Sequence, residues 1–97
     1  MDRAIAVAGV NGEVLDTRAR ILIAAGHADR AAADLADAIG TGGTPLQYFH
    51  LALAYSRTGK TADAAKAFRE GRARGLDVRM VHPDDVPAYA ALGAQAP

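Results

Sequence analysis

The sequence has no cysteine and no tryptophan, and aromatic residues make up only 5% of its 97 residues. Without cysteine, disulfides and thiolate metal ligands are excluded. Basic and acidic side chains number 11 each, so the overall charge gives no support for binding nucleic acid. Charges or glycines interrupt every apolar run well short of the ~20 residues that a bilayer-spanning helix needs, and no membrane span is predicted.

Alanine is the residue in excess. It fills about a quarter of the chain, beside ten glycines. Because alanine buries little area, the hydrophobic content of 51% overstates the material for a core. A chain of this length buries roughly 64% of its unfolded surface on folding, which suits one small domain over residues 1–97.

The N-terminal segment shows no signal-peptide pattern, because residues 1–8 are too short and too acidic for one. The lack of a signal-peptide pattern slightly favours a cytoplasmic location. Residues 2–8 are instead typical of the back half of a helix that starts abruptly. We therefore expect the chain to be a piece of a longer protein, with a short natural protein as the alternative.

The chain contains an internal repeat with a period of 33 residues. When the sequence is shifted by 33, large, small and glycine positions coincide in the same order. The matching pairs are Leu15/Tyr48, Ala19/Ala52, Leu22/Tyr55, Gly26/Gly59, Ala31/Ala64, Leu35/Phe68 and Ala38/Gly71. A shift of 34 also places Ala4 and Ile5 on Ala38 and Ile39, which indicates a third, partial copy.

Each copy has the periodicity of two helices joined by a short turn. Apolar residues step by three and four on either side of a central glycine. Helices are predicted at 2–8, 12–24, 28–39, 45–57, 61–74 and 84–92, with ends good to about two to four residues.

The boundary residues agree with these helices. Thr44 and Gln47 form a capping box, and Pro45 suits the first helical position. Asn11 is a plausible N-cap, and Gly75 is a natural left-handed stop.

The order of large and small residues resembles the tetratricopeptide repeat. The copy from Pro45 to Val78 carries the closest likeness, through Tyr48, Leu51, Ala52, Tyr55, Gly59, Ala64, Phe68 and Gly71. The copy from Gly12 to Thr44 is looser, because Arg18 stands where the family usually has Leu, and neither copy ends in Pro. The resemblance implies an all-α fold, a short right-handed superhelical solenoid of antiparallel helix pairs.

On this resemblance, residues 1–11 are a partial repeat, 12–44 and 45–78 are repeats, 79–92 form a capping helix and 93–97 a frayed tail. A terminal element of this kind covers the last apolar face of a helical array. Val86, Tyr89 and Leu92 are expected to lie on helix 61–74, and Asp84 and Asp85 to favour the start of the cap. The cap also resembles the closing helix of some bacterial tandem-repeat proteins.

The resemblance implies that the first helix of each pair lines a concave binding face. The outward positions of helix 45–57 form a second apolar stripe, with Phe49 as an anchor for a peptide or partner helix. The predicted partner-binding residues are Asp16, Arg20, Leu46, Phe49, His50, Leu53 and Arg57. The alternatives are that neighbouring helices of this chain, or oligomer contacts, cover the stripe, and that Asp16 and Arg20 form only a solvated ion pair. The carboxylate clamp of some family members is not present as a set, which disfavours chaperone-tail binding.

Other chemistries have weaker signals. Ala54 to Thr61 fits a relaxed phosphate-loop pattern, but its first residues have helical spacing, so nucleotide binding is not predicted. The three histidines are far apart in sequence, which argues against a metal site. We therefore predict a non-enzymatic protein-binding module in a larger bacterial protein, without cofactor, metal or nucleic acid. The alternative is a self-association module, with a homodimer formed through helix 2–8.

Overall fold

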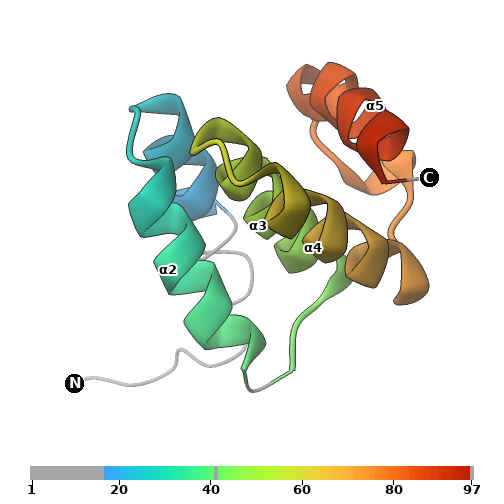
Figure 1. The fold of residues 1–97 in the computed structure, drawn as a ribbon, viewed down its shortest axis with the longest axis horizontal. Helices are drawn as coiled ribbons and strands as arrows, with labels where there is room; N and C mark the ends of the chain where they lie inside the picture. The colour runs from blue at the N-terminus through green and yellow to red at the C-terminus, as the bar shows by residue number, and fades with distance from the viewer. Residues whose placement is uncertain (1–16, 41, 97) are drawn as a thin grey trace.

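The computed structural model describes residues 17–40 and 42–96, and its regular structure is helical (Figure 1). Residues 17–24 are helical and precede α2 (Ala28–Ile39), α3 (Pro45–Arg57), α4 (Thr61–Ala73), the 3₁₀ turns η1 (Val78–Met80) and η2 (Pro83–Asp85), and α5 (Val86–Gln95). No strand occurs in these two ranges, and the predicted all-α class is confirmed for them. The predicted helix 2–8 and the N-cap at Asn11 lie outside the described residues.

Two helical hairpins close with the same turn. Gly26 and Gly59 hold the left-handed backbone, at φ +88° and +81°, which glycine adopts without a Cβ penalty. In both turns one amide reaches back five residues, from His27 N to the Leu22 carbonyl at 2.7 Å and from Lys60 N to the Tyr55 carbonyl at 2.9 Å. The two turns are 33 residues apart, so the turn chemistry repeats with the sequence period.

Three pairs of matched repeat positions are buried in both hairpins, whereas the pair Leu22 and Tyr55 is half-buried. The four alanines at paired positions (Ala19, Ala52, Ala31 and Ala64) are at most 1% exposed. Leu35 and Phe68, which share the large position of the second helices, are fully buried. Alanine at these sites allows close helix approach, and the larger side chains fill the remaining space.

Local boundary chemistry follows the sequence closely. Thr44 Oγ1 accepts a hydrogen bond from Gln47 N at 3.1 Å, and Thr44 N donates to Gln47 Oε1 at 3.0 Å, which completes the capping box. Helix α4 ends at Ala73, one residue before the predicted end, and Gly75 follows with φ +100°.

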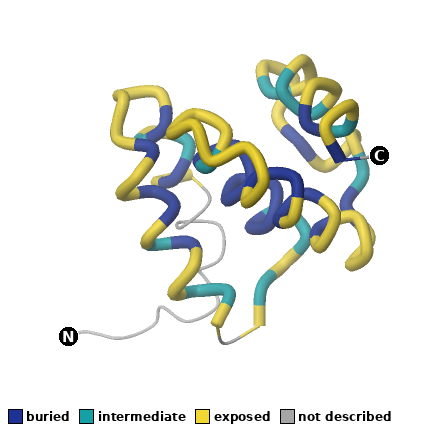
Figure 2. Tube along the Cα trace, viewed as in Figure 1, coloured by how far each residue is buried: buried dark blue, intermediate teal, exposed yellow. Residues whose placement is uncertain are grey.

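Helix α3 is the central helix of the fold (Figure 2). Its eight consecutive residues 47–54 are all buried. It packs against α2 on one side and α4 on the other, and α5 contacts both α3 and α4. The helix therefore has no wide solvent-facing side over these two turns.

The C-terminal segment differs from its prediction in two ways. Residues 93–97 were expected to fray, but α5 continues to Gln95 and Ala96 is fully buried, with its amide donating to the Leu92 carbonyl at 2.9 Å. Leu92 and Tyr89 pack on the core as expected. Val86 does not, because it stands at the first position of α5 and is 40% exposed.

Candidate functional site

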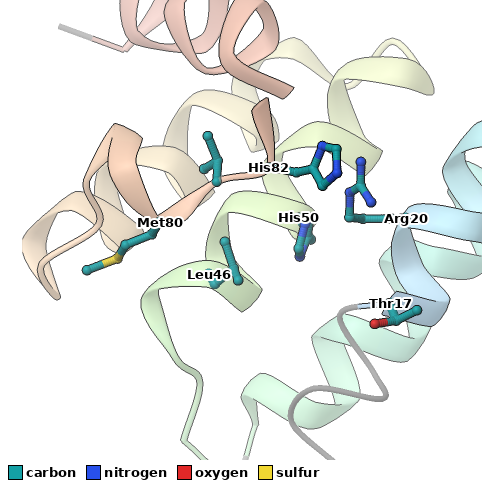
Figure 3. A pocket seen from close by; sticks show the side chains of 7 residues that line it. Thr17, Arg20, Leu46, His50, Met80 and His82 are labelled. Carbon is teal, nitrogen blue, oxygen red and sulfur yellow. The ribbon is translucent and has the colours of Figure 1, made fainter. Parts of the chain in front are cut away.

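An open pocket of about 350 Å³ lies between helical residues 17–24, α3 and the segment around η1. Thr17, Arg20, Leu46, His50, Met80, Val81 and His82 line it. Figure 3 shows the Arg20 and His82 side chains pointing toward one another, with His50 and Leu46 of α3 below them and Met80 pointing away to the left. The pocket combines apolar walls with polar groups, which is the usual make-up of a site that orients a ligand.

An ion pair fixes one side of this pocket. Arg20 Nε donates a hydrogen bond to Asp85 Oδ2 at 3.0 Å, and the side chains are 34% and 15% exposed. This bond uses Nε, and the guanidinium carries two further nitrogens that can donate hydrogen bonds. It also ties the start of α5 to the helical residues 17–24.

The two histidines of the pocket have different surroundings. His50 is buried at 2% exposure, with the Phe49 ring 5.5 Å from its own ring centroid. His82 is exposed, and its Nδ1 accepts a hydrogen bond from Asp84 N at 3.1 Å. A neutral ring with an accepting Nδ1 carries its proton on Nε2, so His82 offers a donor there.

The structure separates the predicted site residues into groups. Arg20, Leu46 and His50 meet at the pocket. Phe49 and Leu53 belong to the core, at 0% and 5% exposure. Arg57 is exposed at the far end of α3, where it lines a different hollow of about 550 Å³ with Ile23, Gly26, Ala28, Asp29 and Thr58. Asp16 lies outside the described residues, so its ion pair with Arg20 stays a prediction.

Phe49 is covered by this chain's own α5. Its ring centroid lies 6.0 Å from that of Tyr89, whose ring also meets Phe68 edge-on at 5.0 Å. Of the two interpretations of the second apolar stripe, coverage by neighbouring helices therefore describes Phe49 in this structure. No partner can touch the ring while α5 stays in place.

One wall of the pocket, which the C-terminal segment forms, was not predicted from the sequence. Met80, Val81 and His82 lie outside the repeat pattern, and no spacing links them to helices 30 to 60 residues earlier. Asp85 was assigned to the charge at a helix start. It does occupy the N-cap of α5, but its carboxylate makes no cap hydrogen bond and pairs with Arg20.

The phosphate-loop pattern falls on occupied backbone. Residues 54–57 belong to α3, and the amides of Thr58, Gly59 and Lys60 donate to carbonyls at the end of that helix. The Lys60 ammonium lies over the Tyr55 ring, 5.8 Å from its centroid. A phosphate cradle needs free amides, which this turn does not offer.

The part of the chain that the structure describes offers neither a metal centre nor a membrane-spanning helix. It holds no group of three or more histidines and carboxylates placed to bind a metal ion. Within the same residues, no helix is long and apolar enough to cross a bilayer.

Comparison with known proteins finds no matching family model, no matching curated protein and no matching solved structure. The function is therefore inferred from the geometry and chemistry of the pocket.

Proposed function

We propose that the chain is a non-enzymatic protein-binding module with a tetratricopeptide-like arrangement, a short right-handed superhelical array within a larger bacterial protein. The 33-residue recurrence supports this arrangement, because three matched pairs of positions are buried in both hairpins and the same turn closes both of them. Arrays of this kind present extended surfaces for partners and leave the chemistry to other domains.

The binding site we propose is the pocket between residues 17–24, α3 and η1. The observation that carries it is the meeting of Arg20, Leu46 and His50, three of the seven residues that the repeat pattern assigns to the binding face. Leu46, Met80 and Val81 supply apolar contact, and the Arg20 guanidinium and His82 supply donors. A peptide with an apolar side chain beside an acceptor group fits this combination.

The test is a selection from a displayed peptide library with the full chain as bait, followed by affinity measurement on the selected peptides. The variant Leu46→Glu places a carboxylate on the apolar wall. We expect it to weaken binding at least tenfold, because it buries a charge against apolar contacts. Met80→Glu should act in the same direction from the opposite wall.

The matched control is Ile21→Glu. Ile21 belongs to the same helical segment as Arg20, is 63% exposed and does not line the pocket. The site is supported if the selected peptides bind the Ile21→Glu chain as tightly as the original chain and bind the Leu46→Glu chain more weakly. Equal affinity for all chains would place the binding surface elsewhere.

Self-association is the second candidate, and the exposure of Ile21 favours it. An apolar side chain of this size on an open helix face suits contact with another chain or with a preceding repeat. The predicted contact through helix 2–8 lies outside the described residues. Sedimentation of the Ile21→Glu chain tests it, because loss of a dimer found with the original chain would locate the contact.

A further inference from the structure

The C-terminal segment 82–96, which we name the arm, is held to the rest of the fold mainly along one side of α5. Only Leu92 and Ala96 are fully buried in it, and Ala88, Tyr89 and Gly93 are half-buried. Ten residues rich in alanine do not make a stable helix alone. The helix of the arm therefore depends on the surface on which it sits.

That surface, which we name the seat, is formed by Phe49 on α3 and Phe68 on α4. Both rings are fully buried, and Tyr89 touches both of them. If the arm leaves, two aromatic rings become exposed to water. The seat therefore needs an occupant, and the structure shows one sequence that fits it.

The chain between the anchored core and α5 is short. Val81 is buried at 7% exposure and fixes the start of the connection, whereas His82, Pro83 and Asp84 are exposed. Short hinge loops invite the exchange of a terminal element between identical chains once strain or a further shortening of the loop hinders the element from folding back on its own chain. Exchange keeps every contact of the arm, because the partner's seat is identical.

We propose that the arm is exchangeable and that the seat accepts the arm of a second copy of this chain. The Arg20–Asp85 pair moves with it, since Asp85 belongs to the arm and Arg20 to the body that receives it. A short tether gives the chain's own arm an effective concentration in the millimolar range, so the closed monomer dominates in dilute solution. The proposal does not depend on the peptide site proposed above.

A pair of charge-reversed chains tests the exchange. One chain carries Arg20→Asp and the other Asp85→Arg, so each chain's own arm meets a like charge. In a mixed dimer with exchanged arms, both contacts regain opposite charges. We expect an equimolar mixture at about 0.1 mM, below the tether's effective concentration, to form a one-to-one dimer in sedimentation and native mass spectrometry. Each chain alone should stay monomeric.

The control adds Leu92→Asp to both charge-reversed chains. Leu92 is 2% exposed, so a carboxylate there prevents the arm from docking in either copy, and the mixed dimer should disappear. A mixture that stays monomeric overturns the proposal. A dimer that survives Leu92→Asp overturns it as well, because the contact would then lie on another surface.

A second variant tests the hinge without changing charge on the body. Deletion of Pro83 and Asp84 shortens the connection, so that the arm no longer reaches its own seat. The expected product is a dimer of the folded chain, and addition of Leu92→Asp should return it to a monomer. A deletion chain that remains monomeric with α5 in place would contradict the exchange.

Discussion

Arg20 and Asp85, 65 residues apart in sequence, are joined by a hydrogen-bonded ion pair of 3.0 Å that fastens the first described helix to the start of α5. Because Arg20 is about one-third exposed, water screens the pair, and we expect a coupling free energy of at most ~1 kcal/mol. A double-mutant cycle with Arg20→Ala and Asp85→Ala measures it by urea unfolding. The coupling should shrink as salt is raised to about 0.5 M.

The matched pair for this cycle is Arg18 with Asp34, at 3.3 Å and with both side chains more exposed. Its coupling should be smaller than that of Arg20 with Asp85. Hydrogen exchange of α5 provides the second readout, since only the loss of the Asp85 pair should speed exchange there. Equal effects of both cycles on α5 would contradict a fastening role for Arg20.

Tyr89 holds α5 on the aromatic pair below it. Tyr89→Ala removes the edge-on contact with Phe68 and the tilted contact with Phe49. We expect a loss of about 1–3 kcal/mol in the free energy of unfolding, because the ring is half-buried and the seat loses its cover. Tyr89→Phe keeps the ring and should stay near the original stability in thermal unfolding. A Tyr89→Ala chain as stable as the Phe variant would show that the ring contacts contribute little.

The capping box at Thr44 stabilises the central helix. Thr44→Ala removes the acceptor for Gln47 N and should cost about 1 kcal/mol of unfolding free energy. Thr61→Ala serves as the control, because Thr61 is exposed at the first position of α4 and its hydroxyl has no hydrogen-bond partner among the described residues. Chemical denaturation of the two variants compares them directly, and equal losses would remove the box as the cause.

Much of the helical framework could be predicted because its signals are local. The capping box at Thr44 and the left-handed glycines at 26, 59 and 75 mark helix ends through chemistry within a few residues. The paired alanines were predicted from the period alone and are buried. These features depend on neighbours in the sequence, or on the same position one repeat away.

The site could be predicted only in part because three of the seven residues that line the pocket come from outside the repeats. The pattern placed Arg20, Leu46 and His50 on one face, and these three do meet at the pocket. It left Phe49 without a packing partner, since that partner is Tyr89, 40 residues on and outside the 33-residue period. No local signal in the sequence predicts that α5 packs against α3.

The start of η1, where Asp77 is the N-cap, has a measurable pH signature. Asp77 Oδ1 accepts hydrogen bonds from Arg79 Nε at 3.1 Å and from Arg79 N at 2.9 Å, and these bonds lower the pKa of the Asp77 carboxyl below its ordinary 3.8. A lowered carboxyl pKa contributes stability above the unfolded pKa, and this contribution is lost as pH falls through the folded pKa. Carboxyl NMR titration should show Asp77 titrating at a lower pH than an unperturbed Asp.

Arg79→Gln separates the two causes of this shift. It removes the guanidinium and leaves the main-chain donor, so the pKa of Asp77 should rise part of the way toward 3.8. Arg74→Gln is the control, because Arg74 pairs with Glu70 and stacks on Tyr48. If the pKa of Asp77 is unchanged in the Arg79→Gln chain, the guanidinium does not contribute to the shift, and the main-chain amide of residue 79 is its cause.

Two helical glycines should respond to the same substitution with opposite signs. A Cβ on Gly71 would lie 3.0 Å from Tyr48 Cβ and 3.3 Å from the Pro45 carbonyl oxygen, where α4 passes close to the start of α3. A Cβ on Gly93 would meet only Phe68, at 3.8 Å or more.

Alanine adds up to about 1 kcal/mol of helix propensity at an unhindered position. We therefore expect Gly93→Ala to raise the free energy of unfolding by a few tenths to ~1 kcal/mol. Gly71→Ala should lower it by about 1–3 kcal/mol through overpacking against α3. Urea unfolding of both chains compares the signs, and stabilisation by Gly71→Ala would show that α4 can move away from α3 at little cost.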